Sequence, residues 1–160
     1  MTKLRKLTAL LLAGALTLLL LTACSGGGGS SGPKAQAEAE VMRAINNDRT
    51  MALSNDPDMQ RIAKKKLAEA NLDANLNGSI EKYKFYNDVK YDRETSTLTL
   101  IAQYDYQNTK LDDLIGCITE GNKSSNLNFN HSSKWTKVGV AAKIHNGKTY
   151  IAITLQVNNT

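Results

Sequence analysis

The stretch from Trp135 to Val157 is apolar at most positions on both of its faces, and its pattern predicts a β-hairpin. Two runs rich in Val, Ile and Thr flank Asn146-Gly147, a pair suited to a two-residue turn with positive φ at both positions. The turn sets the register, and the predicted facing pairs are His145 with Lys148, Lys143 with Tyr150, Ala142 with Ile151, Val140 with Ile153, and Val138 with Leu155. One face of the hairpin carries bulky apolar residues and the other carries mostly small ones. Because both faces are largely apolar, we expect helices or loops to cover both sides of the hairpin.

Three segments show the spacing of amphipathic helices. In residues 35–48 one apolar stripe is formed by Ala37, Val41, Met42 and Ile45. Asp56 and Pro57 suit the N-cap and first position of a second helix, whose buried side is expected to hold Met59, Ile62, Ala63, Leu67 and Ala70. A third helix is expected to start at Thr109 and to bury Leu111, Leu114, Ile115 and Ile118. Lys64-Lys65-Lys66 is interpreted as the solvated side of the second helix.

The remaining segments read as strands and loops. Residues 71–79 are rich in Asn and Gly and predict a loop, and 80–91 predict a strand or an irregular aromatic segment. A turn over 92–96 precedes a clearer strand over 97–106, whose buried side is expected to hold Leu98, Leu100, Ala102, Tyr104 and Tyr106. Residues 123–133 predict a polar loop anchored by Leu127 and Phe129. Since helices and strands do not alternate strictly, the expected class is α+β with a mostly antiparallel sheet.

The first part of the chain has the features of a lipoprotein signal. Lys3, Arg5 and Lys6 precede an uncharged, mostly apolar run over 7–21, which is short for a membrane span. The following Leu-Thr-Ala-Cys resembles the bacterial lipobox, in which the signal is removed and the cysteine is lipidated. We therefore expect a signal peptide over 1–23, lipid on Cys24 with a Gly/Ser-rich tether over 24–35, and a domain over 36–160 on the extracytoplasmic face of the cell membrane.

Removal of the signal changes the charge and the cysteine count. Three of the 20 basic residues lie in the signal, so the rest of the chain carries 17 basic and 15 acidic residues. This small excess of positive charge does not indicate a nucleic-acid-binding protein. With Cys24 acylated, Cys117 is alone and cannot form an internal disulfide; we interpret it as a small buried apolar residue.

Several separated features together resemble the CAP superfamily, also called SCP-like domains. The segment 41–49, VMRAINNDR, resembles the opening helix of that family, and Leu67-Ala68 lies where its second helix is found. Asn126-Leu127, after the third helix, resembles the segment before the final hairpin. The most specific match is 135–141, WTKVGVA, which resembles the aromatic-T-x-I/V-G-x-G/A strand. The resemblance implies an α-β-α sandwich in which this hairpin is central.

The resemblance also shows what this chain lacks. Many members bind a divalent cation in a cleft with two histidines and two acidic residues. The family's glutamate position falls near Thr99, and its second histidine falls near Lys123 or Ser124. The only two histidines, His131 and His145, match neither position and are interpreted as exposed polar residues. We therefore expect no metal site, no cofactor and no catalytic residue from the family pattern.

Three hypotheses about function follow from these observations. The first is a non-catalytic, lipid-anchored CAP-like domain, a degenerate bacterial member, that binds a protein, a cell-wall polymer or a lipid. The second is a cell-envelope hydrolase with an unrecognised site, although the chain has no G-x-S-x-G, H-E-x-x-H or P-loop motif. The third is a generic cystatin-like α+β lipoprotein with helix on one face of its sheet.

Overall fold

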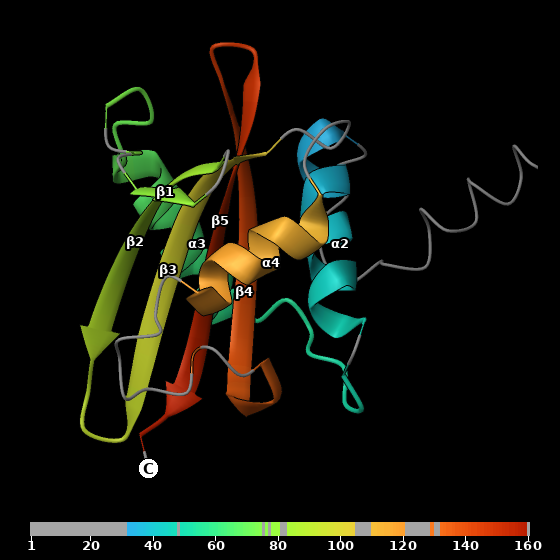
Figure 1. The fold of residues 1–160 in the computed structure, drawn as a ribbon, viewed down its shortest axis with the longest axis vertical. Helices are drawn as coiled ribbons and strands as arrows, with labels where there is room; N and C mark the ends of the chain where they lie inside the picture. Colours follow the sequence, from blue (N-terminus) through green and yellow to red (C-terminus); the bar gives the residue numbers. More distant parts are fainter. Residues whose placement is uncertain are drawn as a thin grey trace, which may run out of the picture. The chain divides into compact units, whose positions relative to one another are not determined.

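The chain forms helices and an antiparallel sheet in the compact unit that begins at Gly32. The computed structural model describes residues 32–47, 49–74, 76, 78–80, 83–104, 110–120, 129 and 132–159. Its elements, labelled in Figure 1, are α2 (Pro33–Asn46), α3 (Pro57–Glu69), β1 (Gly78–Ile80), β2 (Tyr83–Tyr91), β3 (Thr95–Tyr104), α4 (Leu111–Glu120), the 3-10 helix η2 (Ser132–Lys134), β4 (Trp135–His145) and β5 (Lys148–Asn158). The predicted α+β class is confirmed. No helix in the described ranges is long and apolar enough to cross a membrane.

The five strands lie in the order β1-β2-β3-β5-β4, and every neighbouring pair is antiparallel. The hairpin β4–β5 has the predicted turn, because Asn146 and Gly147 have φ of 48° and 73°. All five predicted facing pairs are present in the register. The hairpin is nevertheless not in the middle of the sheet: β5 is an interior strand next to the central β3, while β4 forms one edge.

Apolar side chains gather in two clusters that contain alternate residues of the central strands. The larger cluster joins the stripes of α2 and α4 to β3, β4 and β5; its members include Ala37, Val41, Ile45, Leu114, Ile118, Leu98, Leu100, Val140 and Ile153. The second joins α3 to the intervening positions: Ala63, Leu67, Leu72, Ile101, Ala141, Tyr150 and Ala152. Both faces of the β4–β5 hairpin are therefore buried, as its apolar pattern predicted.

Helix α3 comes unusually close to the sheet at one glycine. A Cβ atom on Gly139 would lie 2.1 Å from the backbone nitrogen of Gln60 and 2.2 Å from the carbonyl carbon of Met59. Both are backbone atoms at the start of the helix, which a side chain cannot displace cheaply. The helix begins here because Asp56 accepts hydrogen bonds from the backbone nitrogens of Asp58 and Met59, each at 3.0 Å, and Pro57 suits the first position.

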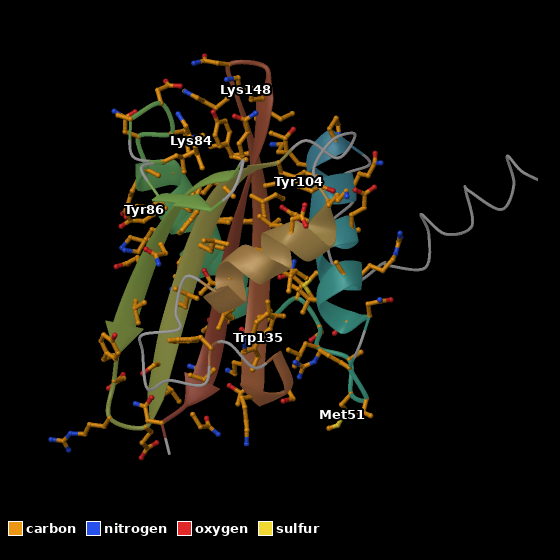
Figure 2. All side chains as sticks on the ribbon, viewed as in Figure 1. Met51, Lys84, Tyr86, Tyr104, Trp135 and Lys148 are labelled. Carbon is orange, nitrogen blue, oxygen red and sulfur yellow. The ribbon has the colours of Figure 1, made fainter. Side chains whose placement is uncertain are left out.

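Strand β4 contains a bulge near its first residue. Trp135 pairs with Val157 and Lys137 pairs with Gln156, so Thr136 is the extra residue. Residues three positions apart in a regular strand point to opposite faces. The extra residue instead places Trp135 and Val138 on the same face, in the same cluster. The indole nitrogen of Trp135 donates a 2.8 Å hydrogen bond to the carbonyl oxygen of Phe129. Figure 2 shows Trp135 at the end of β4 that is far from the hairpin turn, whereas Lys148 lies beside that turn.

The outer edge of β4 is closed by hydrogen bonds from α2, from the start of α3 and from the segment between them. Asn55, which also forms an isolated bridge with Val138, brings its side-chain amide to the backbone of Val140. The bonds along this edge are Asp56 N to Val138 O at 2.8 Å, Val140 N to Asn55 Oδ1 at 2.9 Å, Asn55 Nδ2 and Gln60 Nε2 to Val140 O at 3.2 and 3.1 Å, and Ala142 N to Glu38 Oε1 at 2.8 Å. They occupy backbone groups that an exposed edge strand would present to another chain.

Several predicted boundaries differ from the structure. Helix α2 begins at Pro33, inside the range assigned to the tether, because proline is well suited to the first helical turn. Residues 78–79, predicted as loop, belong with Ile80 to strand β1, since β2 supplies pairing partners that a local pattern does not reveal. Strand β3 begins at Thr95, so the turn is shorter than 92–96. Thr109, Leu127, His131, Lys123 and Ser124 lie outside the described residues, as do residues 1–31 with Cys24.

Candidate functional site

Polar side chains form rows across the α3 side of the sheet, and these rows are the strongest candidate for a functional surface. The strand register places four residues of neighbouring strands in line. We call the first line the outer row; it consists of Lys90 on β2, Thr97 on β3, Gln156 on β5 and Lys137 on β4. The next line, the inner row, consists of Asp88, Thr99, Thr154 and Gly139. The third line is apolar apart from a tyrosine hydroxyl and belongs to the α3 cluster: Tyr86, Ile101, Ala152 and Ala141.

The rows differ in exposure because α3 covers only part of this side of the sheet. The third line packs beneath α3, and the inner row lies where the helix begins. In the outer row, Thr97 and Gln156 are half-buried, while Lys90 and Lys137 are exposed. The outer row therefore presents two polar side chains between two ammonium groups, across four strands that span about 14 Å at the usual strand spacing.

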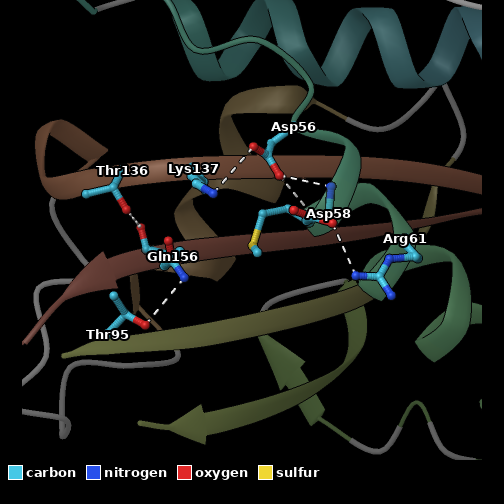
Figure 3. Close-up of polar contacts among 8 residues, drawn as sticks. Asp56, Asp58, Arg61, Thr95, Thr136, Lys137 and Gln156 are labelled. Atoms are coloured by element: carbon cyan, nitrogen blue, oxygen red, sulfur yellow. Dashed lines mark hydrogen bonds and ion pairs between the residues drawn. The ribbon is translucent and has the colours of Figure 1, made fainter. Parts of the chain in front are cut away.

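Figure 3 shows the contacts of two outer-row residues, Gln156 and Lys137. The side-chain nitrogen of Gln156 donates to Thr95 Oγ1 at 3.4 Å, and the hydroxyl of Thr136 donates to the backbone oxygen of Gln156 at 3.2 Å. At the β4 end, Lys137 Nζ lies 3.8 Å from Asp56 Oδ2, with the lysine side chain 46% exposed. This pair is too long and too exposed to hold Lys137 firmly. The row thus combines a half-buried polar centre with exposed cationic ends.

Two members of the inner row form a buried hydrogen-bonded pair. The hydroxyls of Thr99 and Thr154 lie 3.0 Å apart, and both residues are almost fully buried. Thr99 is the residue that the CAP resemblance placed at the glutamate of a metal-binding cleft. In this structure its hydroxyl is paired with that of Thr154 and is not presented to solvent.

Asp88 and Lys66 join β2 to α3 beside the inner row. Lys66 Nζ lies 2.6 Å from Asp88 Oδ2. The hydrogen bond to Asp88 raises the pKa of Lys66, and this effect outweighs the lowering caused by burial. Lys64 instead donates to Gln60 and Lys65 lies 3.9 Å from Glu69, both on the same helix. Lys64 and Lys65 therefore agree with the interpretation of this run as the outer side of a helix, whereas Lys66 reaches the sheet.

His145, interpreted from the sequence as an exposed polar residue, is partly buried and has polar partners. Its Nε2 atom lies 3.0 Å from Asp73 Oδ2 and 3.2 Å from Asn146 Nδ2, and its side chain is 34% exposed. Its ring meets Tyr150 edge to face, with centroids 6.2 Å apart. Burial raises the pKa of the Tyr150 phenol, and the negative charge of Asp73 adds to this. The cluster connects the hairpin turn to the loop after α3.

The described residues contain no group of three or more His, Cys, Asp or Glu side chains that could hold a metal ion. Cys117 lies in α4, but its side chain is outside the described part of the structure. Sequence reasoning missed the outer row, although Thr95, Thr97 and Thr99 alternate with Ser96, Leu98 and Leu100 and so indicate a polar side of β3. The partners on β2, β4 and β5 have no such local signal.

The sequence matches none of the protein-family models and none of the curated proteins with which it was compared.

Proposed function

We propose that this chain is a non-catalytic, lipid-anchored domain of the cell envelope that binds a cell-wall polymer through the outer row. The proposal rests on one observation: four strands align Lys90, Thr97, Gln156 and Lys137 on a part of the sheet that α3 leaves open. Hydroxyl and amide side chains both donate and accept hydrogen bonds. Such groups suit a polymer rich in hydroxyl and acetamido groups, and the lysines favour one that also carries carboxylates or phosphates.

The anchor part of this proposal depends on Cys24. A lipid on this residue would place the domain on the extracytoplasmic face, with the Gly/Ser-rich segment as a tether. Intact-mass analysis of protein extracted from membranes tests this part. The expected mass corresponds to loss of residues 1–23 and addition of acyl groups. An unmodified Cys24, or a chain that retains Met1, contradicts it.

We further propose that the domain is a degenerate CAP-like member with an α-β-α sandwich. Two observations support the sandwich: α2 and α4 share one apolar cluster with the sheet, and α3 shares the other. The burial of both hairpin faces also argues against the cystatin-like alternative, which has helix on one face only. An experimental structure compared with CAP domains tests this assignment. Saturable stabilisation by divalent cations would contradict the loss of the metal site.

Binding is tested by sedimentation of the full-length, detergent-solubilised protein with purified insoluble cell-wall sacculi. The double variant T97V/Q156A removes the central polar groups of the outer row while Val preserves the shape of Thr. Two neutral hydrogen bonds of about 0.5–1.5 kcal/mol each predict roughly a tenfold loss of affinity. The K137A variant should weaken binding and reduce its dependence on salt.

Matched controls come from the other end of the sheet. T149V changes a half-buried threonine of β5, and K148A changes an exposed lysine beside the hairpin turn. Both should bind like the wild type. Equal binding by T97V/Q156A and the wild type would contradict the assignment to the outer row. Release of soluble wall fragments by the wild type would favour the hydrolase alternative.

A further inference from the structure

The two edges of the sheet are treated differently by the rest of the chain. Along β4, side chains and backbone from the segment before α3, together with Glu38, bond the outward groups of Val138, Val140 and Ala142. At the other edge, β1 pairs only with Tyr83, Lys84 and Phe85 of β2. Strand β2 continues to Tyr91, and within the described part of the chain no strand pairs with its outer side from Tyr86 onward. This open stretch is about 20 Å long.

The open stretch of β2 carries a self-complementary charge pattern. Asp88 and Lys90 lie two residues apart and therefore on the same side of the strand. In an antiparallel pair of two β2 strands centred on Val89, Asp88 of each copy faces Lys90 of the other. We propose that the open edge of β2 pairs in this register with the same edge of a second copy of the chain. The proposal does not depend on the polymer ligand proposed above.

Charges select this register over its neighbours. A shift that places Asp88 opposite Asp88 of the second copy brings two carboxylates together. A shift in the other direction places Lys90 opposite Lys90. Like charges directly opposite destabilise a strand pair, whereas opposite charges stabilise it. A lysine on an edge strand commonly prevents such pairing. Here Asp88 lies two positions before Lys90, so each lysine would face a carboxylate of the second copy.

The other side of β2 also fits a second copy. Val89 is partly buried against the larger apolar cluster, and in the proposed register it meets Val89 of the second copy. Tyr91 is 65% exposed, one of three large hydrophobic residues in the described chain with high exposure. It would face Asn87 of the second copy, and the paired strands would cover part of its ring. An interface of one short strand pair is small, so we expect weak, concentration-dependent association.

Cysteine cross-linking in the full-length protein tests the register directly. In the double variant N87C/Y91C, residue 87 of one copy faces residue 91 of the other, within the Cα separation that a disulfide requires. Mild oxidation in membranes should give a covalent dimer on a non-reducing gel. The single variants N87C and Y91C place their thiols about four residues apart along the strands and should give no dimer beyond the wild-type level. Equal dimer in a single variant overturns the register.

Charge reversal in this cross-linking background tests the complementarity. K90D changes an exposed side chain and leaves the Lys66–Asp88 pair in place, so it should fold while losing most of its cross-linked dimer. D88K, which also removes the Lys66–Asp88 pair, should lose dimer as well. Coexpression of K90D with D88K should restore the dimer as a mixed species, because Asp and Lys then face each other at both positions. Full cross-linking of K90D alone, or cross-linking to a different protein in place of a second copy, overturns the proposal.

Discussion

Gly139 lies directly beneath the backbone of Gln60, and a Cβ atom there would come within 2.1 Å of the Gln60 nitrogen. The absence of a side chain at this one position lets the start of α3 rest against strand β4. The same contact brings Asp56 to Val138 and Asn55 to Val140, so it also closes the β4 edge.

The variant G139A should therefore be strongly destabilised. The added methyl group must displace helix backbone, and overpacking of this kind costs about 1–3 kcal/mol and sometimes more. G116A is the matched control, because a Cβ at Gly116 in α4 meets nothing within 4 Å. Alanine is the better helix former, so G116A should gain up to about 1 kcal/mol. Urea unfolding measures both; equal stability of the two variants would contradict the close approach of α3.

The Thr99–Thr154 pair should show strong coupling. Either single variant, T99V or T154V, leaves one buried hydroxyl without its partner, at a cost of about 1–3 kcal/mol. The double variant replaces both hydroxyls by methyl groups of similar shape and should lie close to the wild type. A double-mutant cycle from urea unfolding gives the coupling energy. Additive losses would mean that the two hydroxyls do not depend on each other.

Asp56 should stabilise the chain as a helix cap and not as an ion-pair partner. D56A removes the acceptor for two backbone N–H groups at the start of α3 and should cost about 1 kcal/mol. D56N retains a good capping side chain without the charge, so it should stay near the wild type. K137A should change stability by no more than about 0.5 kcal/mol, since its pair with Asp56 is exposed and 3.8 Å long. Thermal melts distinguish the alternatives; a loss in K137A equal to that in D56A would favour the ion pair.

Stability should fall at alkaline pH, partly because of Tyr150. Its pKa is raised in the folded chain from the ordinary value of 10.0, chiefly by burial and further by Asp73. As pH rises through 10.0, the unfolded chain releases the phenol proton first, which favours unfolding. The free energy of unfolding is therefore unaffected by this group below that pH and decreases above it, up to the raised folded pKa. One proton gives a slope of at most about 1.4 kcal/mol per pH unit.

The variant Y150F should make this alkaline decrease shallower. Lys66, whose pKa is raised from 10.5, acts in the same direction and should leave part of the slope in place. Urea unfolding between pH 8 and pH 11 compares the two slopes and does not depend on the stability of Y150F at neutral pH. Identical slopes would show that Tyr150 ionises equally easily in the folded and unfolded chains.

Sequence alone determined the features that depend on neighbouring residues. Asn146-Gly147 selects a turn with positive φ, and this turn sets the register of β4 and β5. Asp56-Pro57 starts α3, and the stripe Ala37, Val41, Ile45 identifies the buried side of α2. These patterns act through backbone conformation and side-chain spacing within a few residues, so they can be read without the rest of the chain.

Tertiary structure decided which residues share a surface. Thr97 and Gln156 face each other although 59 positions separate them, and Lys90 and Lys137 join them only through the strand order β2-β3-β5-β4. The burial of Thr99, the closed edge of β4 and the open edge of β2 depend on the same long-range pairing. Many strand orders satisfy the local patterns equally well, and only the packing of helices against the completed sheet selects one of them.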